Sequence, residues 1–489
     1  MLIPVWREIA FDLDTAVGAF ARLREGRFSF LLESAPAGGE TWSRFSYLGT
    51  APRLAWRLLD GVVQEWTHDR GWHAERRPAR PLDDLEALLA RERAAPDPAL
   101  ARATGGFWGG FVGFFGYDAV RYIEQLGAPP RQGVGVPDAL FIATRVLVVI
   151  DHLRSRAILV ATVHLPDGVT AAAETRIRAQ AERDLDDAQR RLADGTSLRP
   201  IELREDPAPA TGESSMSRDH FERAARRIKE YILAGDAFQV LLARRIAVEH
   251  DFDTTDLYRA LRMLNPSPYM YHLQLDGMEL VGSSPELLVR VQDRRVVVRP
   301  IAGTRRRDGT VEGDARLAAE LLADEKERAE HLMLVDLGRN DVGRVAEYGS
   351  VAVTEMMAVE RYSHVLHIVS QVEGALRHGV TAMDAFRATF PAGTMTGAPK
   401  VRAMQIIDEL EPERRGPYAG AVGYISADGT RMDLAITIRT CVVANGVASV
   451  QAGAGIVHDS VPAAEWEETE SKARALLTAI ARARSQTRA

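Results

Sequence analysis

Two long runs of short apolar segments joined by tight polar turns constrain the fold of this chain more than any other feature. Residues 269–304 and 420–457 contain the turn sequences LDGME, QDRR, ADGT and ANGV between strand-like stretches. Such turns connect neighbouring antiparallel strands directly, without a crossover helix. Helical stretches at 217–235, roughly 312–336 and 463–484 separate or follow these runs. We therefore expect an α+β fold with largely antiparallel sheets.

The chain has 489 residues, which is enough for two or three ordinary domains or for one large domain with a companion. Residues 203–217 are polar and rich in proline and alanine, as expected of a linker. We therefore predict an N-terminal region at 1–205 and a second domain at 217–489. In the first region, 15–26 has the pattern of a helix and 27–34 that of a strand.

Composition and charge exclude several classes of protein. The formal net charge of −7 argues against a nucleic-acid-binding protein, because such proteins normally carry a basic surplus. No stretch approaches the roughly 18 uncharged apolar residues that a membrane-spanning helix needs. The first residues reach acidic side chains too early for a secretory signal. The single cysteine, Cys441, rules out an intrachain disulfide, and these features together predict a cytoplasmic protein.

Two helical segments carry pairs of glutamates at a spacing of three residues. Glu327 and Glu330 lie in DEKERAEHLMLVD, and Glu465 and Glu468 lie in AAEWEETESK. Side chains three residues apart share one face of a helix. Mg²⁺ is typically held by one or two carboxylates together with water and substrate oxygens, so the two segments could share one ion. The alternative is two solvated helix faces with local ion pairs, such as Glu468 with Lys472.

Histidines and glycines mark three further segments. RYSHVLHIVS contains His364 and His367, and residues 390–400 and 450–460 are rich in glycine. A histidine in an apolar strand is more often a packed or surface residue than a catalytic one. Closely spaced backbone N–H groups in glycine-rich loops bind carboxylates well, but single glycines more often mark ordinary turns. By themselves these segments leave both interpretations open.

A series of motifs in sequence order, from about residue 217 to 480, makes the chain similar to the chorismate-utilising enzyme family. The motifs are GDAFQVLLARR, NPSPYMY, GSSPELLVR, RPIAGTRRR, DEKERAEHLMLVDLGRND, YSHVLHIVS, FPAGTMTGAPKVRAM, RGPYAGAVGY, TIRT and QAGAGIVHDSVPAAEWEETESKA. The family includes anthranilate, aminodeoxychorismate, isochorismate and salicylate synthases. The resemblance implies a large α/β sandwich in which mostly antiparallel sheets surround a central site and helices lie outside.

The resemblance also implies a magnesium site. Glu330 and Glu468 resemble the Mg²⁺ ligands of the family, and Glu327 and Glu465 resemble residues that support them. In such enzymes the cation holds the ring carboxylate of chorismate, neutralises it and polarises the ring toward loss of the C4 hydroxyl. Lys472, one turn after Glu468, is expected to balance the charge of the site.

Further residues resemble the catalytic and substrate-binding groups of the family. Glu286, in SSPE, resembles the acid that protonates the leaving hydroxyl, and His367 resembles the histidine near C2 that assists elimination of pyruvate. Tyr418 and Arg439 resemble clamps for the enolpyruvyl carboxylate, since a guanidinium suits a bidentate carboxylate contact. The full set of expected substrate contacts is Gly303, Thr304, Thr394, Tyr418, Arg439, Gly453, Ala454 and Gly455.

Two positions distinguish the members of the family. Members that add water carry a lysine base where this chain has Gln239, and glutamine has no titratable proton with which to activate water. Aminodeoxychorismate synthases commonly carry a nucleophilic lysine where this chain has Ala302, and alanine has no nucleophile. Gln239 and Ala302 together favour the anthranilate synthases, which use ammonia. The alternatives are an aminodeoxychorismate synthase, an aminodeoxyisochorismate synthase and a catalytically inactive tryptophan-sensing scaffold.

The N-terminal region resembles a regulatory element. FLLES at 30–34 resembles the segment of anthranilate synthases that binds tryptophan as a feedback inhibitor, with Glu33 or a nearby backbone carbonyl receiving the amino group. The alternative is an ordinary buried strand, because this expectation depends on analogy. The expected tryptophan contacts are Leu32, Glu33, Ser34, Asn265, Pro268, Tyr269, Met270, Val422 and Tyr424.

The source of ammonia is expected to lie on another chain. A glutamine amidotransferase needs a nucleophilic cysteine with a histidine partner. Cys441 lies in the apolar sequence AITIRTCVVANGV, without a nucleophile-elbow pattern, and is typical of a core thiol. We therefore predict a separate glutamine amidotransferase subunit, anthranilate synthase component II, in a hetero-oligomer that passes ammonia between its subunits.

Overall fold

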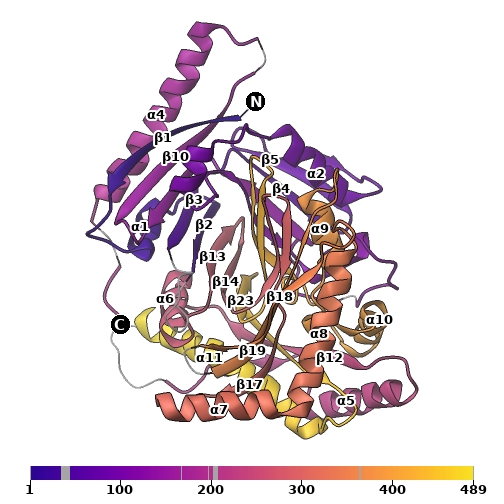
Figure 1. Cartoon of the computed structure of the whole chain (residues 1–489). Helices are drawn as coiled ribbons and strands as arrows, with labels where there is room; N and C mark the ends of the chain where they lie inside the picture. Colours follow the sequence, from indigo (N-terminus) through magenta and orange to yellow (C-terminus); the bar gives the residue numbers. More distant parts are fainter. Residues whose placement is uncertain are drawn as a thin grey trace.

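Two large sheets form the centre of the molecule, and helices cover their outer faces (Figure 1). The computed structural model describes residues 2–34, 44–130, 132–166, 168–195, 198–201, 207–362 and 365–487. Neighbouring strands pair antiparallel, as β2 does with β13 and β7 with β21. The predicted α+β class with antiparallel sheets is thus confirmed.

The first sheet has twelve strands and places N-terminal strands beside strands of the second half of the chain. In spatial order they are β1 (Leu2–Ala10), β10 (Arg156–His164), β9 (Val146–Asp151), β3 (Phe45–Thr50), β2 (Phe28–Glu33), β13 (Tyr269–Leu275), β14 (Met278–Ser284), β23 (Thr440–Ala444), β24 (Val447–Ile456), β12 (Gln239–Glu249) and β11 (Glu213–Ser214). The short strand β20 (Gly397–Ala398) pairs with β12.

The second sheet also has twelve strands and the same mixed origin. Its spatial order is β17 (Ile301–Arg306), β19 (Val365–Ala375), β16 (Arg295–Val298), β15 (Leu287–Gln292), β22 (Arg431–Ile436), β21 (Ala421–Ser426), β7 (Gly110–Phe115), β8 (Ala139–Ala143), β4 (Leu54–Leu59), β5 (Val62–Thr67) and β6 (Gly71–Arg76). The strand β18 (Ala352–Arg361) pairs with β19.

Both sheets cross the boundary that the sequence predicts at 205–217. In the first sheet Leu32 of β2 lies opposite Tyr271 of β13, and in the second Val112 of β7 lies opposite Tyr424 of β21. These pairings join the two regions through backbone hydrogen bonds. The stretches 1–205 and 217–489 therefore share one pair of sheets.

An apolar core lies between the two sheets. Phe28 and Phe30 of β2 belong to the same buried cluster as Ile142 of β8 and Ala435 of β22. Burying one large apolar side chain stabilises a fold by about 1.5–3 kcal/mol. The cluster contains residues of both sheets, so it holds them face to face.

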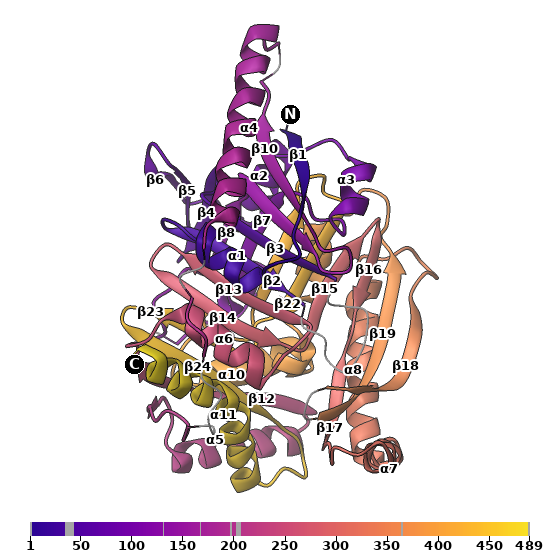
Figure 2. The same ribbon diagram turned by 90° about the vertical axis from the view of Figure 1, so that its left-hand side faces the viewer.

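Helices lie on the outside of the sheets, and α4 projects beyond them at the top of Figures 1 and 2. The buried side chains of α1, α4, α6 and α11 pack in one cluster against strands of the first sheet. The helices are α1 (Ala16–Leu23), α2 (Pro81–Arg91), α3 (Pro98–Ala103), α4 (Ala171–Ala193), α5 (Arg218–Leu233), α6 (Thr254–Leu264), α7 (Val311–Ala323), α8 (Glu325–Gly343), α9 (Ala382–Thr389), α10 (Lys400–Leu410) and α11 (Pro462–Thr487), with 3₁₀ turns η1 (Tyr117–Tyr122) and η2 (Gly393–Met395).

Several local signals in the sequence are confirmed. The Thr15 side chain accepts a hydrogen bond from a backbone N–H in the first turn of α1, and Ser217 does the same at α5. Asn445 and Gly446 both have positive φ angles, of 53° and 75°, in the turn between β23 and β24. That geometry is the one expected for an Asn-Gly hairpin turn.

The prediction of one helix at roughly 312–336 is wrong. The segment forms two helices, because α7 ends at Ala323 and α8 begins at Glu325. Asp324 lies between them in an extended conformation, and its carboxylate accepts hydrogen bonds from the N–H groups of Lys326 and Glu327. An aspartate that caps the first turn in this way starts a new helix.

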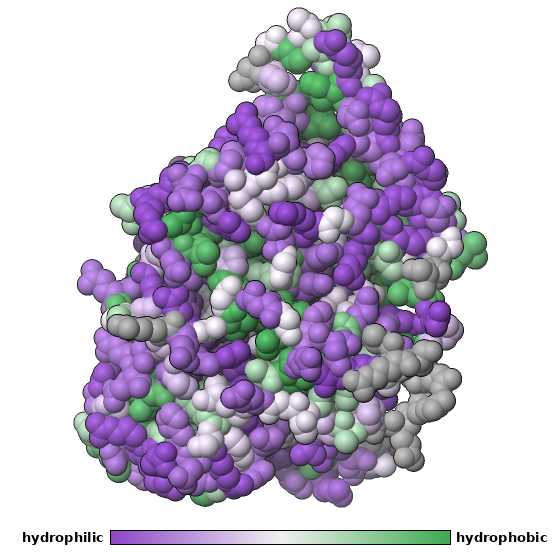
Figure 3. Space-filling view, turned by 180° about the vertical axis from the view of Figure 1, so that it is seen from behind, coloured by the Kyte–Doolittle hydropathy of each residue, from purple (hydrophilic) through white to green (hydrophobic). Residues whose placement is uncertain are grey.

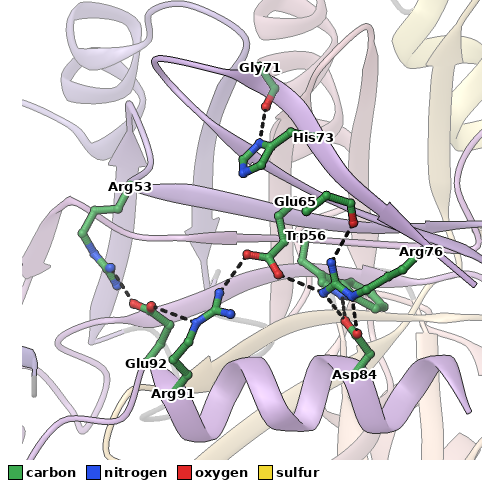
Figure 4. A network of polar contacts seen from close by, with 10 residues as sticks. Arg53, Trp56, Glu65, Gly71, His73, Arg76, Asp84, Arg91 and Glu92 are labelled. Carbon is green, nitrogen blue, oxygen red and sulfur yellow. Dashed lines mark hydrogen bonds and ion pairs between the residues drawn. The ribbon is translucent and has the colours of Figure 1, made fainter. Parts of the chain in front are cut away.

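A polar network fixes α2 to strands of the second sheet (Figure 4). The Asp84 carboxylate accepts hydrogen bonds from Trp56 Nε1 at 2.8 Å and from the Arg76 guanidinium at 2.6 and 2.7 Å. Glu65 accepts from Arg76 and from Arg91, each at 2.8 Å. The partners come from β4, β5, β6 and α2, so the network ties the helix to three strands.

The face of the molecule seen from behind is mostly hydrophilic, with apolar side chains scattered between polar ones (Figure 3). Scattered apolar side chains are normal on a protein surface. No helix in the described ranges is both long enough and apolar enough to cross a membrane.

Candidate active site

The starts of α8 and α11 bring the paired glutamates together. Glu327 and Glu330 lie in the first two turns of α8, and Glu465 and Glu468 lie in the first two turns of α11. Burial and the carboxylates of Glu327 and Glu468 raise the pKa of Glu330 above its ordinary value. Burial and Glu468 likewise raise the pKa of Glu465. The two helices therefore present their carboxylates to one region, here called the acidic cluster.

The acidic cluster suits a hard divalent cation that shares its ligands with a substrate. Like-charge repulsion between carboxylates disfavours their ionised forms, and a bound cation relieves that repulsion. Within the described ranges, no three His, Cys, Asp or Glu side chains are close enough to cage a metal ion on their own. Mg²⁺ commonly uses one or two carboxylates and completes its coordination with water and substrate oxygens. The donor set therefore fits Mg²⁺.

Lys472 connects the acidic cluster to the rest of the site. Its Nζ forms an ion pair with Glu468 Oε1 at 2.6 Å and donates a hydrogen bond to the Gly453 carbonyl oxygen at 3.0 Å. Glu286 and His367 both lie within electrostatic reach of this ammonium group. Lys472 is therefore placed to balance the charge of the cluster.

Glu286 is a buried carboxyl between β14 and β15. Its Oε1 accepts a hydrogen bond from Thr394 Oγ1 at 3.0 Å. Burial raises the pKa of Glu286 to about 8, although the Thr394 hydrogen bond and the Lys472 charge act to lower it. At neutral pH the group is mostly protonated and able to donate a proton.

His367, on β19, is suited to accept a proton, whereas Glu286 is suited to donate one. Burial lowers the pKa of its imidazole, so the ring is neutral at pH 7. Its Nδ1 lies 2.9 Å from the Gly303 carbonyl oxygen and 3.2 Å from Thr304 Oγ1. A carbonyl oxygen only accepts hydrogen bonds, so Nδ1 carries the proton and Nε2 is the basic nitrogen.

Gly303 lies between His367 and the acidic cluster. It has a positive φ of 65°, and a Cβ at this position would lie 3.1 Å from Glu327 Oε2. Glycine adopts this backbone conformation without the steric cost that other residues meet. The motif IAGT therefore needs glycine where the chain passes the carboxylates.

Tyr362 belongs to the same region, and sequence reasoning missed it. Its ring meets the His367 ring edge-on, with centroids 5.2 Å apart, and its hydroxyl donates to Glu360 Oε2 at 2.9 Å. The Glu286 carboxyl lies within its electrostatic reach. The signal in the sequence was an aromatic residue inside the motif YSHVLHIVS. His364 of that motif lies outside the described residues.

Arg439 and Tyr418 flank the strands β21 and β22. Burial lowers the pKa of the Arg439 guanidinium, whereas Tyr418 and Glu468 act to raise it, so all three groups lie near one another. Arg439 has a positive φ of 50°, a conformation that costs a non-glycine residue roughly 1–2 kcal/mol and is concentrated at functional sites. A Cβ on Gly453 would lie 3.1 Å from the Tyr418 hydroxyl.

The glycines of β24 leave room for Gln239. A Cβ on Gly455 would lie 2.6 Å from Gln239 Nε2, so a larger residue would displace this amide. Gln239 Oε1 is buried and has no hydrogen-bond partner among the described residues. Ala454 lies between Gly453 and Gly455, so its methyl group points to the opposite face of the strand. Ala302 is buried on β17 and adds no reactive group.

A second site lies between the two sheets. A cavity of about 260 Å³ contacts strands of both, and we call it the inter-sheet cavity. Asn265 does not line it, although the sequence predicts that it should: this residue ends α6, and its carbonyl oxygen accepts a hydrogen bond from Ser283 Oγ. The other expected tryptophan contacts all line the cavity, namely Leu32, Glu33, Ser34, Pro268, Tyr269, Met270, Val422 and Tyr424.

The inter-sheet cavity also has charged residues that sequence reasoning missed. Arg290 of β15 and Asp433 of β22 lie opposite each other, and Arg290 Nε donates to Asp433 Oδ2 at 2.8 Å. Arg290 Nη2 donates to the Tyr269 hydroxyl at 2.9 Å. Asp433 Oδ1 is buried and has no hydrogen-bond partner within the described structure. The signal was charged residues inside otherwise apolar strands, namely Arg290 in LLVRVQ and Asp433 in RMDLAI.

The Glu33 carboxylate is directed toward α6. It accepts a hydrogen bond from the Tyr258 hydroxyl at 2.5 Å and pairs with Arg262 at 3.4 Å. Alternate residues of a strand face opposite sides, so Leu32 and Glu33 point in different directions. Residue 33 therefore offers its backbone rather than its carboxylate to the inter-sheet cavity.

Cys441 is the only cysteine of the chain, and it is buried in β23. Burial, together with the charge of Glu279, raises the pKa of its thiol to about 12. A thiol with such a pKa forms almost no thiolate near neutral pH and is a poor nucleophile. The prediction of a core thiol is confirmed.

Comparison with known proteins gives a consistent result. The family model described as "chorismate binding enzyme" matches residues 43–478. The anthranilate synthase component 1 of Pseudomonas putida is 48% identical over 98% of this chain and 95% of its own length, and that of Pseudomonas aeruginosa is 48% identical with the same coverages. The crystal structure of anthranilate synthase component I from Streptococcus pneumoniae matches with a TM-score of 0.73 and 36% identity, over 90% of this chain and 93% of that one.

Proposed function

The chain belongs to the chorismate-binding enzyme family, and on that premise we propose that it is the large subunit of a cytoplasmic anthranilate synthase. This enzyme converts chorismate and ammonia to anthranilate and pyruvate, the first committed step of tryptophan biosynthesis. The observation that carries the proposal is one site that holds the Glu286 carboxyl, bonded to Thr394, and the His367 imidazole, bonded to Gly303, beside the Lys472–Glu468 ion pair. Burial raises the pKa of Glu286 and lowers that of His367, which suits them to act as acid and base. Gln239 and Ala302, where related enzymes use lysine, support the use of ammonia rather than water or an enzyme amine.

Substrate binding uses residues beside the acidic cluster, because Arg439 and Tyr418 lie near Glu468. The Arg439 guanidinium and the Tyr418 hydroxyl clamp the enolpyruvyl carboxylate, and charge-assisted hydrogen bonds of this kind are roughly twice as strong as neutral ones. Gly453 and Gly455 leave room for the side chains of Tyr418 and Gln239, because a Cβ at either position would meet one of them. Gly303 and Thr304 hold His367 toward the ring through its Nδ1.

Glu286 supplies the proton in the first step. Ammonia attacks C2 of the ring, the ring double bonds shift, and the C4 hydroxyl takes the Glu286 proton and leaves as water. A carboxyl with an ordinary pKa would be ionised at neutral pH and unable to donate. Burial of Glu286 keeps it protonated, and Thr394 orients its Oε1.

His367 accepts the proton in the second step. Its Nε2 removes the hydrogen from C2, and the bond between C3 and the enolpyruvyl oxygen breaks as the ring becomes aromatic. The side chain leaves as enolpyruvate, which takes up a proton at its methylene carbon to become pyruvate. The lowered pKa of His367 keeps the imidazole in its basic form at neutral pH.

Glu330 and Glu468 would hold Mg²⁺, with Glu327 and Glu465 beside them. When bound, the cation neutralises the ring carboxylate of the substrate and polarises the ring toward loss of the C4 hydroxyl. Lys472 offsets part of the negative charge of the glutamates through its ion pair with Glu468.

Ammonia comes from a glutamine amidotransferase subunit in a hetero-oligomer. The buried Cys441 thiol is unsuited to glutamine hydrolysis, and the relatives in both Pseudomonas species carry the name "component 1". Free ammonium should therefore support turnover without the partner.

The inter-sheet cavity binds tryptophan as a feedback inhibitor. Tyr47, Tyr269 and Tyr424 line it with aromatic surface, which suits an indole ring. The buried, unpartnered Asp433 Oδ1 is an acceptor for an N–H group of this ligand. The strands β15 and β22 carry the Arg290–Asp433 pair beside the cavity. Glu286 directly precedes β15, and Arg439 follows β22. These two strands therefore connect the inter-sheet cavity to the proposed active site.

The decisive experiment is a product assay on the purified chain with chorismate, Mg²⁺ and ammonium at alkaline pH. We expect fluorescent anthranilate and an equal amount of pyruvate, and inhibition of both by tryptophan. A product that retains the pyruvyl group, detected by mass spectrometry, would identify an aminodeoxychorismate or aminodeoxyisochorismate synthase instead. Absence of any turnover would favour the inactive scaffold.

A further inference from the structure

Arg415 and Glu411 form a fully buried ion pair behind the proposed site. Their side chains are 1% and 3% exposed, and Arg415 Nε and Nη2 donate to the two carboxylate oxygens at 2.9 and 2.6 Å. Replacing a buried ion pair with apolar residues of similar volume is often neutral or stabilising. Stability alone is therefore a weak reason for this pair to be present.

The remaining donors of Arg415 hold two separate pieces of backbone. Nη1 donates to the Met395 carbonyl oxygen at 2.6 Å, and Nη2 donates to the Leu241 carbonyl oxygen at 3.0 Å. Met395 directly follows Thr394 in η2, and Leu241 lies two residues after Gln239 in β12. One guanidinium thus fixes the loop that carries Thr394 to the strand that carries Gln239.

The same guanidinium lies near a third part of the site. It is 4.7 Å from the centre of the Tyr117 ring and 5.8 Å from that of the Tyr418 ring. A cation within about 6 Å of an aromatic ring is attracted to it. Glu411, for its part, accepts a hydrogen bond from the Ala243 N–H at 2.9 Å, again on β12. The pair therefore contacts the surroundings of three groups that face the substrate.

We infer that Arg415 is a positioning residue for the reaction, which holds Thr394 against the Glu286 carboxyl and fixes Tyr418 relative to β12. This inference rests on the proposed function, because it assigns the loop and the tyrosine to the chorismate site. Arg415 itself touches no substrate. A planar guanidinium with several donors in a fixed geometry is the side chain that joins such fragments at defined angles.

Loss of Arg415 has a specific expected consequence. The loop at 393–396 loses its anchor, and Thr394 no longer donates reliably to Glu286, a bond that favours the ionised carboxyl. The alkaline limb of the kcat–pH profile should therefore move to higher pH. Lys472 and Tyr362, two titratable groups that interact with the Glu286 carboxyl, lie on different elements and should be unaffected.

The test compares two double variants of the full chain with free ammonium as the nitrogen source. Glu411→Leu with Arg415→Met removes the buried pair without leaving a lone charge. The matched control is Arg245→Met with Glu413→Leu. That pair is also bidentate, at 2.7 and 2.8 Å, and also joins β12 to the segment after α10, but it donates nothing to the loop at 393–396.

We expect kcat of the Glu411/Arg415 double variant to fall at least about tenfold, since small displacements in a site cost that much or more. Its alkaline limb should shift to higher pH, as is also expected for Thr394→Val, whereas the control should keep the wild-type pH profile. Thermal melts of both variants account for any general loss of stability. If the two double variants show the same kcat and the same pH profile, Arg415 has only a structural role and the inference is overturned.

Arg415→Lys provides a second test that keeps the buried charge. A single ammonium cannot reproduce the contacts to Glu411, Met395 and Leu241 together, so we expect an intermediate loss of kcat and the same direction of shift. Wild-type kinetics in this variant would also overturn the inference. Failure of the proposed function is distinguishable, because the wild-type chain would then give no anthranilate.

Discussion

Thr394 Oγ1 lies 3.0 Å from Glu286 Oε1 and joins a glycine-rich loop to a carboxyl 108 residues earlier in the chain. Two opposing effects act on the pKa of Glu286. Burial raises the pKa of Glu286 to about 8, and the Thr394 hydrogen bond acts to lower it, because the hydroxyl donates to the ionised form. The effect of burial is the larger of the two, so the Glu286 carboxyl is protonated at neutral pH and can act as the acid.

Thr394→Val should shift the pH dependence of turnover. With Glu286 as the acid, kcat at saturating ammonia should be level below pH 8 and fall above it, as the proton is lost. Valine removes a donor that favours the carboxylate, so the pKa of Glu286 rises further and the fall moves to higher pH. The measurement is kcat from pH 6 to 10. A limb that moves to lower pH would contradict this account of Thr394.

Glu286→Gln should remove most turnover and change how stability depends on pH. Loss of a general acid costs about 10²–10⁴ in kcat. Between pH 4.5 and 8 the native Glu286 retains a proton that the unfolded chain releases, so wild-type stability decreases as pH rises through that window. The glutamine side chain does not titrate, so the variant lacks this decrease in stability. Thermal unfolding at pH 5 and pH 9 should show a smaller decrease for the variant than for wild type.

Glu330→Gln should abolish the response to Mg²⁺. This carboxylate lies beside Glu327 and Glu468 in the acidic cluster, and loss of a ligand should lower kcat at saturating Mg²⁺ at least about 100-fold. Mg²⁺ titration calorimetry, with circular dichroism to confirm the fold, checks this prediction. Glu467→Gln is the matched control, since Glu467 lies on α11 but pairs with Arg218 on the surface. Equal activity in both variants would disprove the metal assignment.

His367→Gln should separate the two steps of the reaction. Glutamine keeps polar contacts but has no basic nitrogen, so amination can proceed while removal of the C2 proton cannot. We expect aminodeoxyisochorismate, which retains its pyruvyl group, to accumulate at the expense of anthranilate. Mass spectrometry of the product mixture measures their ratio. Anthranilate formed at the wild-type rate would assign the base elsewhere.

Ser34→Arg should relieve tryptophan inhibition and leave catalysis intact. Ser34 lines the inter-sheet cavity of about 260 Å³, and an arginine there fills space that the indole needs. The tryptophan concentration for half inhibition should rise at least about tenfold. The control is kcat and KM for chorismate without tryptophan, which should match wild type. Unchanged inhibition would show that tryptophan binds elsewhere.

The local elements were predictable because their signals lie within a few residues of each other. Thr15 and Ser217 begin helices, and Asn445–Gly446 forms a hairpin turn, through interactions that span one turn of chain. The error at 312–336 also arises from relying on local signals. Its helical pattern continues through Asp324, and the competing signal was a single cap.

By itself the sequence determined the fold class, the family and most candidate residues of the site. Only the tertiary structure decided that Glu33 turns away from the inter-sheet cavity, that Asp433 lies opposite Arg290, and that Arg415 reaches Met395. These relationships depend on strand register and on burial between segments far apart in the chain. A register shift of one residue reverses which face a side chain occupies, and no local pattern encodes the register between distant strands.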